Sequence, residues 1–412
     1  MDRAPMGGRT ASPAIPIAVL LLQCTFLAAA ILNPVDFLAL QSVRRALRDS
    51  PGSTFFSSWD FTSDPCNFSG VLCYDSRVVA LNLGDQTAGS PGLSGRIDPS
   101  IGRLSSLAEF TVVPGRVSGA LPDAISQLTG LRFVGISRNF ISGEIPAGLA
   151  GLRSLQTLDL SYNQLNGSIP WTAGALPSLS NLILCHNLLS GPVPPFLSQT
   201  LTRIDLSHND LSGSLPPYAL PPSLQYLSLS ANRLSGPVDR ILPRLKRANH
   251  VDLSMNRFTG TIPAAVFAFP ISELLLQRNA FSGCVRLDAP ARIGTVDLSY
   301  NRLSGEISPF LAGVRTLYLN NNRFAGEVPV GFVDRLEAAG IQTLYLQHNF
   351  LTGVEISPTA EIPLTTSFCL QYNCMVPPVQ AACPLKSGQQ KRRPVEQCPR
   401  RRGIDVNSPS KK

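Results

Sequence analysis

The sequence predicts an α/β solenoid in which short parallel strands stack into one curved sheet. Three observations support this. A unit of mostly 21 to 24 residues recurs about twelve times, each unit holds an alternating L-x-L core, and an asparagine follows that core at a fixed distance. The recurrence is plainest in LDLSYNQLNGSIP (158–170), IDLSHNDLSGSLP (204–216) and VDLSYNRLSGEIS (296–308). Because one unit cannot bury its apolar side alone, neighbouring units must stack.

Aligned on the asparagine, the unit reads L-x-x-L-x-L-x-x-N-x-L-S-G-x-I-P. Its copies begin at Leu107, Leu131, Leu155, Leu179, Leu201, Leu224, Ala248, Ile271, Ile293, Val314 and Ile341. A degenerate first copy begins at Val78, with Gln86 in place of the asparagine and an insertion at 87–92. We therefore predict a solenoid over residues 78–358.

Within each unit, the L-x-L core has the period of a strand. Leu158 and Leu160 should point inward, while Asp159 and Ser161 point outward. The asparagines fall where the chain turns inward, so their amides should pair with buried backbone groups and form a structural ladder. The ladder residues are Asn139, Asn163, Asn187, Asn209, Asn232, Asn256, Asn279, Asn301, Asn322 and Asn349.

The unit resembles the plant-type extracellular leucine-rich repeat. A front segment, 31–77, adds to the resemblance: Asn33-Pro34 suits a helix start, and residues 59–73 (WDFTSDPCNFSGVLC) resemble the N-terminal cap of plant leucine-rich repeat receptors, with Phe68 where those caps usually have tryptophan. The resemblance extends to receptor-like ectodomains and polygalacturonase-inhibitor-like proteins. It implies that partners bind on the concave sheet.

The first thirty residues read as a secretory signal peptide. Arg3 and Arg9 precede an apolar run from about 15 to 32, which holds the small-residue string 28–30. An uncleaved signal anchor is the alternative, and it also leaves the rest of the chain outside the cell. No later segment is apolar enough to span a membrane. We expect a secreted protein of the cell wall or of the outer plasma-membrane surface.

Cysteines flank the solenoid, as expected for disulfides formed in an oxidising compartment. Cys66 and Cys73 should pair in front. Three pairings remain open in the rear cap, 359–398, which holds Cys369, Cys374, Cys383 and Cys398. Zinc is the rival interpretation of the rear group, but we expect no metal and no cofactor. Cys185 and Cys284 are fillers or surface thiols, with an intermolecular disulfide as the alternative.

The net charge of +8 lies almost wholly at the C-terminal end. Residues 386–412 hold nine Lys or Arg and two acidic residues, which leaves the body nearly neutral. We predict a disordered basic tail at 399–412, with disorder beginning as early as residue 386. Such a tail suits an acidic polysaccharide outside the cell, and a nucleic-acid partner is excluded there.

The outward positions of the repeat supply the candidate site, because no nucleophile, phosphate-loop, metal-protease or kinase pattern is present and we expect no enzyme. All four histidines occupy such positions, and charging them in an acidic wall would alter a partner's affinity. The candidate partner-binding residues are Tyr162, His186, Arg203, Asp205, His208, Tyr226, His250, Asp252, Tyr300, Tyr318, Tyr345, Gln347 and His348.

Three functions follow from this surface. The first is a recognition module that binds a peptide or receptor partner, such as a receptor kinase, in signalling or defence. The second is an inhibitor of a secreted wall-degrading enzyme such as polygalacturonase, and the third is a structural wall component. Asn67 and Asn166 begin N-x-S sequons and are expected to be glycosylated on export.

Overall fold

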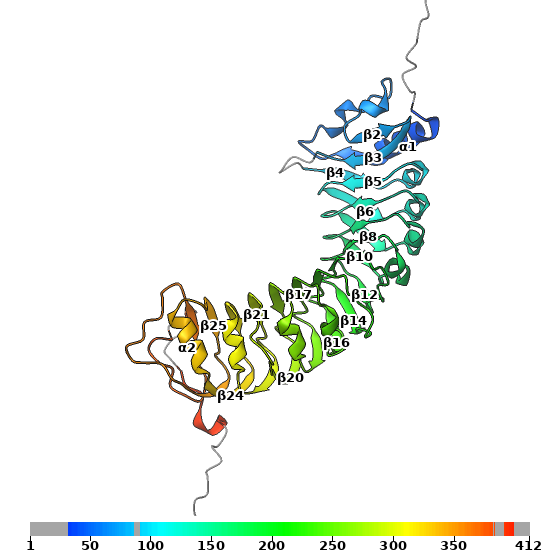
Figure 1. The fold of residues 1–412 in the computed structure, drawn as a ribbon. Helices are drawn as coiled ribbons and strands as arrows, with labels where there is room; N and C mark the ends of the chain where they lie inside the picture. Colours follow the sequence, from blue (N-terminus) through cyan, green and yellow to red (C-terminus); the bar gives the residue numbers. More distant parts are fainter. Residues whose placement is uncertain (1–31, 86–90, 382, 384–390, 399–412) are drawn as a thin grey trace, which may run out of the picture. The chain divides into compact units, whose positions relative to one another are not determined.

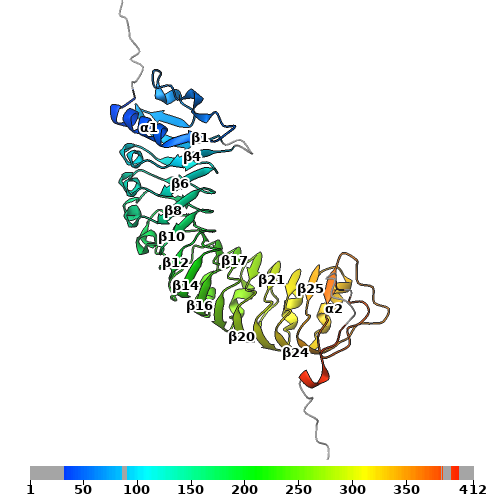
Figure 2. The same ribbon diagram turned by 180° about the vertical axis from the view of Figure 1, so that it is seen from behind.

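The computed structural model describes residues 32–85, 91–381, 383 and 391–398. The expected signal peptide, most of the insertion at 87–92 and the tail 399–412 lie outside the described residues. Residues from Leu32 onward form one compact unit with a continuous apolar core. Figures 1 and 2 show its strands stacked coil upon coil from the N-terminal helix α1 to the C-terminal helix α2.

The main sheet has 14 strands in chain order, and each pairs in parallel with the next except β2, which is antiparallel to β3. We call its solvent-facing side the concave face. The strands are β2 (Val71–Tyr74), β3 (Arg77–Leu83), β5 (Glu109–Val112), β7 (Phe133–Gly135), β9 (Thr157–Asp159), β11 (Asn181–Ile183), β13 (Arg203–Asp205), β15 (Tyr226–Ser228), β17 (His250–Asp252), β19 (Glu273–Leu275), β21 (Thr295–Asp297), β23 (Thr316–Tyr318), β25 (Thr343–Tyr345) and β27 (Ser367–Cys369).

The L-S-G part of each unit builds a second row of strands that the repeat pattern does not reveal. A 5-stranded and an 8-stranded sheet run along the other side of the coils, linked by a bridge between Ser168 and Ser190. The first comprises β1 (Leu47–Asp49), β4 (Leu93–Arg96), β6 (Arg116–Ala120), β8 (Phe140–Glu144) and β10 (Gln164–Asn166). The second comprises β12 (Ser190–Gly191), β14 (Asp210–Ser214), β16 (Arg233–Pro237), β18 (Arg257–Gly260), β20 (Ala280–Cys284), β22 (Arg302–Gly305), β24 (Arg323–Val328) and β26 (Phe350–Val354).

The asparagine ladder joins each coil to the one before it, as the sequence predicts. Asn256 is typical: its Oδ1 accepts from the backbone N–H of Leu234, and its Nδ2 donates to the carbonyls of Leu229, Leu253 and Ser254. These backbone groups lie inside the coil, where an unpaired polar group is costly. The ladder is therefore structural.

The N-terminal cap closes the first coil. Helix α1 (Pro34–Ala46) is capped by Asn33, whose side chain accepts a hydrogen bond from the backbone N–H of Val35. The buried Asp36 carboxylate pairs with Arg77 of β3 at 2.9 Å, which fixes the helix to the sheet. Phe68 is 3% exposed and packs on the buried Trp59, so it fills the place in which related caps usually have tryptophan.

Disulfides secure both caps and settle the open pairings. Cys66 pairs with Cys73, as predicted. The rear cysteines form the pairs 369–383 and 374–398, which leaves no thiolates there for zinc. Strand β27 shows that the rear cap contains one more coil, because Cys369 occupies a strand position and Asn373 extends the ladder. The predicted end of the solenoid at 358 is therefore one coil too early.

Residues 391–398 belong to the stretch from residue 386 for which composition predicts disorder, and in the structure they contact the last coils. Arg393 donates through its Nε to the carbonyl of Asn349 at 2.9 Å, and its guanidinium lies 4.3 Å from the ring centroid of Phe350. The short helix η10 (Val395–Gln397) follows, and the disulfide of Cys398 closes the segment. A cation–π contact and a disulfide thus hold residues that composition alone marks as a polar tail.

Among the eleven copies that begin at Leu107 and later, one spacing exceeds the others, from Val314 to Ile341, and its extra residues form α2 (Val330–Glu337). Phe332, Val333 and Leu336 bury one face of this helix. Among the described residues, neither α1 nor α2 is long and apolar enough to cross a bilayer.

Candidate binding surface

Parallel pairing in register brings the same repeat position of successive coils side by side on the concave face. Three columns result. The first strand column is the residue before the first Leu of each L-x-L core, such as Thr157. The second strand column is the residue after that Leu, such as Asp159. The turn column is the residue immediately before each ladder asparagine. Turn-column residues such as Tyr162 and His186 have a positive φ of 54°, which an L-residue adopts only when its surroundings enforce it.

The first half of the turn column holds a continuous stack, which we call the turn stack: Arg138, Tyr162, His186 and His208. The Arg138 guanidinium lies 4.1 Å from the ring centroid of Tyr162. The Tyr162 and His186 rings stack at 4.2 Å, and the His186 and His208 rings at 4.1 Å. These distances match the separation of adjacent strands, so the sheet itself sets the stack.

A second stack lies on the strands, and we call it the strand stack: Arg203, Tyr226, His250 and Glu273. The Arg203 guanidinium lies 3.9 Å from the ring centroid of Tyr226, and the Tyr226 and His250 rings stack at 4.5 Å. The Nδ1 of His250 is 2.9 Å from Oε2 of Glu273. The two stacks share the coil of β13, which supplies both Arg203 and His208.

Towards the C-terminal end the surface holds three separate pairs. Tyr318 and Tyr345 of the second strand column meet edge to face, with ring centroids 5.2 Å apart. In the turn column, Arg278 lies over Tyr300 at 4.6 Å, and His348 stacks on Tyr372 at 4.4 Å. The first strand column beside them holds Thr295, Thr316 and Thr343.

The structure therefore groups most of the candidate residues but places three of the histidines differently. His250 lies on a strand, whereas His186, His208 and His348 lie in the turn column, as do Tyr162 and Tyr300. An outward repeat position is thus not always a strand position. The rings still border the concave face, because they stack along its edge.

Both candidate carboxylates, Asp205 and Asp252, have local structural partners. Asp205 is 8% exposed and accepts from the hydroxyl of Ser207 at 2.7 Å. Asp252 accepts from the backbone N–H of Ser254 at 2.9 Å. The D-L-S sequence thus stabilises its own turn, which explains its recurrence. Gln347 is 7% exposed, and its buried Oε1 accepts no hydrogen bond from the described residues.

Sequence reasoning missed Arg138, Glu273, Arg278 and Tyr372, which complete the stacks and pairs. The signal was available, because each of them occupies the same repeat position as a residue already selected. Arg138 and Arg278 precede ladder asparagines, as Tyr162 does, and Tyr372 precedes the unpredicted ladder residue Asn373.

Burial changes the acid–base properties of this surface. It lowers the pKa of His186, and the neighbouring His208 lowers it further. Burial also lowers the pKa of His348, with a further contribution from Arg393. Burial and then Asp205 raise the pKa of Tyr226. Burial and, after it, the neighbouring His208 thus favour the neutral form of His186.

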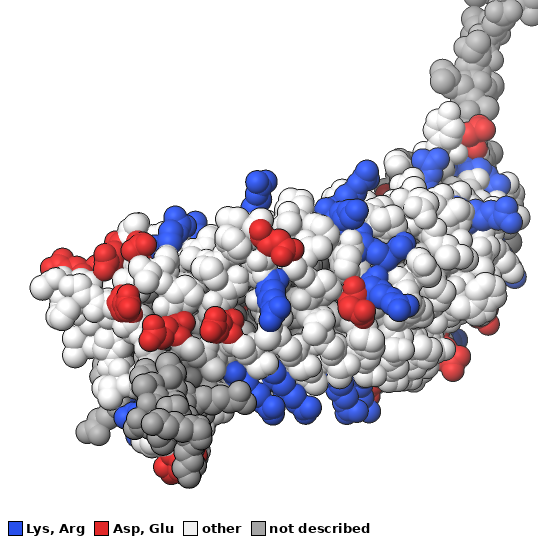
Figure 3. All heavy atoms as spheres, turned by 60° about the horizontal axis from the view of Figure 1, so that its bottom comes forward, with Lys and Arg blue, Asp and Glu red and all other residues white. Residues whose placement is uncertain are grey.

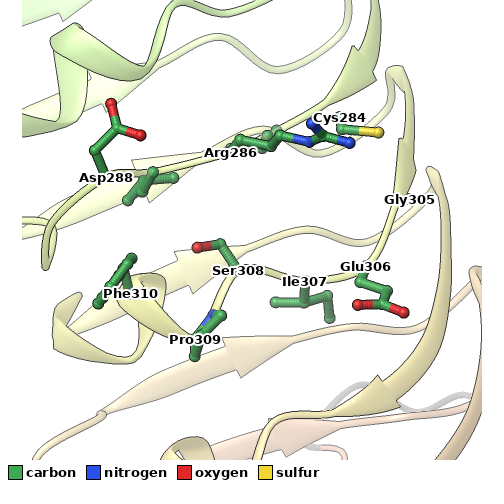
Figure 4. A pocket seen from close by; sticks show the side chains of 11 residues that line it. Cys284, Arg286, Asp288, Gly305, Glu306, Ile307, Ser308, Pro309 and Phe310 are labelled. Carbon is green, nitrogen blue, oxygen red and sulfur yellow. The ribbon is translucent and has the colours of Figure 1, made fainter.

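The two unpaired cysteines differ. Cys185 is buried beneath the concave face, where burial raises the pKa of its thiol to about 11, so it is a small filler with little thiolate character. Cys284 is exposed at the end of β20. It borders a hollow of about 650 Å³ with Arg286 and Glu306, away from the concave face (Figure 4).

Surface charge gives no single basic field on the side shown in Figure 3, where basic and acidic side chains lie in scattered groups. No set of three His, Cys, Asp or Glu side chains in the described ranges is arranged to hold a metal ion. Both sequon asparagines, Asn67 and Asn166, are exposed. The stacks of the concave face are therefore the most organised chemistry in the described part of the chain.

Comparisons with known proteins agree with this architecture. Residues 33–74 match the leucine rich repeat N-terminal domain, and residues 154–176 and 200–219 match the Leucine Rich Repeat. The chain is 34% identical over 137 residues to Receptor-like protein 54 of Arabidopsis thaliana, a match that covers 32% of this chain and 17% of that protein. The chain thus spans only a small part of this relative.

Two solved structures extend the likeness over most of the chain. The plant peptide hormone receptor RGFR1, solved in complex with RGF2, matches with a TM-score of 0.64 and 28% identity, over 72% of this chain and 48% of that one. A plant ice-binding protein matches with a TM-score of 0.55 and 27% identity, over 81% and 99%. By repeat, cap and fold, the chain has the leucine-rich repeat architecture and is similar to the ectodomains of plant receptor-like proteins.

Proposed function

We propose that this protein binds a peptide or receptor partner at the plant cell surface through its concave face. The observation that carries the proposal is the strand stack on that face together with the turn stack along its edge. Aromatic and Arg side chains dominate binding hot spots because they offer large contact area. Here each ring is already held between neighbours, so little conformational freedom remains to be lost on binding.

The ends of the stacks define the chemistry of the partner. Arg138 ends the turn stack, and Arg203 and Glu273 are the two ends of the strand stack. A partner that lies across the coils can place an acidic group against either arginine and a basic group against Glu273, with apolar surface over the rings between them.

The structural neighbours also support the binding of a peptide or receptor partner. RGFR1 is a peptide hormone receptor solved with its hormone, and the fold is shared over most of this chain. The relatives and the disulfides also indicate an extracellular protein. Glycosylation at Asn67 and Asn166 forms part of the proposal, and so does export directed by the N-terminal signal peptide.

Affinity capture from a plant wall and membrane extract tests the proposal. The bait is the secreted protein, compared with a variant in which Tyr226, His250, Tyr318 and Tyr345 are all alanine. A matched control changes Tyr218 and Phe310, exposed aromatics off the concave face, to alanine. We expect the native protein and the control to retain one protein partner that the concave variant loses.

The identity of the retained partner separates the candidate functions. A receptor kinase or a peptide supports recognition in signalling or defence. A wall hydrolase whose activity falls on binding supports the inhibitor role. Equal retention by all three baits contradicts the concave-face proposal, and retention of acidic polysaccharide alone, released by salt, supports a structural role through the basic tail.

A further inference from the structure

A hollow away from the concave face is lined by an exposed tryptophan, Trp171, which the repeat does not explain. The hollow has a volume of about 430 Å³ and lies where β6, β8 and β10 lead into the short helices η4 (Asp123–Gln127), η5 (Ala147–Gly151) and η6 (Trp171–Ala175). Trp171 begins η6 and is 75% exposed. The other tryptophan, Trp59, is 6% exposed.

The solenoid has no need of a large side chain at this position. Asp123, Ala147 and Ala264 begin the equivalent short helices, each directly after a proline as Trp171 is. The exposed indole of Trp171 instead offers a flat apolar surface in the lining of the hollow. Trp171 is therefore a departure from the repeat that gives this hollow an aromatic wall.

The lining beside the ring is rich in hydrogen-bond acceptors. Glu144 and Asp123 contribute carboxylates, and neither forms an ion pair with another residue of the described ranges. Ser168 and Thr172 add hydroxyls. Glu144 extends along the next coil, since a β-carbon added to Gly167 would lie 2.8 Å from its Cγ. Hydrogen-bond acceptors thus lie in the same lining as the apolar ring of Trp171.

We propose that this hollow binds a neutral, β-linked glycan. A sugar ring of this class has a flat C–H face, which suits stacking on the Trp171 indole, and an edge of hydroxyls that donate to Glu144 and Asp123. The two carboxylates also repel an anionic sugar, so the site selects neutral chains. This site is independent of the concave face.

The hollow of Figure 4 occupies the equivalent place in later coils. It lacks the combination found at Trp171, an exposed indole beside carboxylates with no cation in the lining. There the exposed aromatic is Phe310, only 38% exposed, and the guanidinium of Arg286 shares the space with Glu306. A cation beside the carboxylate removes the preference for a neutral ligand. The inference is therefore confined to the hollow at Trp171.

The glycan has two sources, which one substitution separates. Asn166 precedes Ser168 in a sequon and is exposed near the hollow, so a sugar attached to it is an internal source. Asn166→Gln removes that sugar and leaves Ser168, a lining residue, intact. The full-length secreted protein is prepared in both forms.

Fluorescence titration with cellohexaose is the test, because the indole of Trp171 is the exposed one of two. For the Asn166→Gln protein we expect a saturable blue shift. Calorimetry should show that Trp171→Ala in the same background weakens binding at least about tenfold. Tyr218→Ala, another exposed aromatic, is the matched control and should bind normally. Hexagalacturonate should bind at least about tenfold more weakly than cellohexaose.

Each result decides the proposal. Binding by the Asn166→Gln protein but not by the glycosylated protein assigns the site to the protein's own glycan, with the same neutral-sugar chemistry. Binding by both assigns it to an external glycan. No saturable signal from either form, equal affinity of the Trp171→Ala protein, or equal binding of hexagalacturonate overturns the proposal. Unfolding midpoints confirm that the variants are folded.

Discussion

At the scale of single residues, the environment of a side chain on this surface comes from coils more than twenty residues away in sequence. His186 lies between Tyr162 and His208, each contributed by a neighbouring coil. Its acid–base behaviour is therefore a property of the stack, and the asparagines behind it hold the turn in place. Both facts lead to measurable effects.

The first prediction concerns stability and pH. Because burial lowers the pKa of His186 and of His348, the unfolded chain binds protons at these sites more readily than the folded one. Their contribution to stability is present above about pH 6.5, the usual histidine value, and is lost as pH falls through the lowered values. We expect the unfolding midpoint of the native protein to fall over this range.

The double variant His186→Gln, His348→Gln isolates the effect. Its unfolding midpoint, measured from pH 7.5 to 4.5 beside that of the native protein, should fall less steeply below about pH 6.5. Identical pH profiles for the two proteins would contradict the assignment of lowered pKa values to these rings.

The second prediction concerns binding and pH. Protonating His186 would place a charge on a ring that stacks on His208 at 4.1 Å. Partner affinity should therefore change between about pH 5 and 7, in a direction set by the charge that the partner presents. A titration of the captured partner tests this, and a flat profile contradicts it.

The third prediction concerns the ladder. Asn256→Ala leaves the backbone N–H of Leu234 and three carbonyls without their side-chain partner. We expect a loss on the order of 1–3 kcal/mol in the free energy of unfolding, measured by urea denaturation. Asn181→Ala, which removes a bond to the hydroxyl of Thr157 on the exposed face, is the control and should cost much less. Equal effects would show that the ladder has no special role.

At the scale of elements, the repeat pattern predicts the strands and asparagines that recur at a regular spacing. It misses features that depart from the repeat motif. The main sheet and the ladder follow from L-x-L and from the asparagines. The sequence pattern did not reveal the additional coil at β27, because Phe368 replaces the first Leu of the core and residues 375–377 replace the L-S-G that follows the asparagine. It did not reveal the second sheets, because each of them contains glycines with a positive φ, such as Gly236 at 84°. The stacks need the register between coils, which one unit cannot supply.

The C-terminal closure gives the fourth prediction. Arg393 ties residues 391–398 to the last coils through Asn349 and Phe350. Arg393→Ala should leave the chain folded but speed amide hydrogen exchange in β25 and β27, because the end of the solenoid opens more often. Arg323→Ala, at an exposed position of β24, is the control. Unchanged exchange in both strands would contradict the role of Arg393 as a closure.

At the scale of the whole molecule, the protein presents two chemically distinct surfaces. The concave face carries rings and guanidinium groups held by their neighbours, and the hollow at Trp171 carries an indole beside carboxylates. The composition indicates neither surface, since the described body is nearly neutral and its charges are scattered on the side shown in Figure 3. Each surface can be removed without touching the core that the coils share.

The most direct measurement of the central claim is the equilibrium affinity of the captured partner for Tyr226→Ala and for His250→Ala, with unfolding midpoints measured alongside. If the strand stack is a binding surface, each variant should lose about tenfold or more in affinity while its midpoint stays close to the native value. If the rings only line the sheet, affinity will be unchanged, and that result would contradict the account.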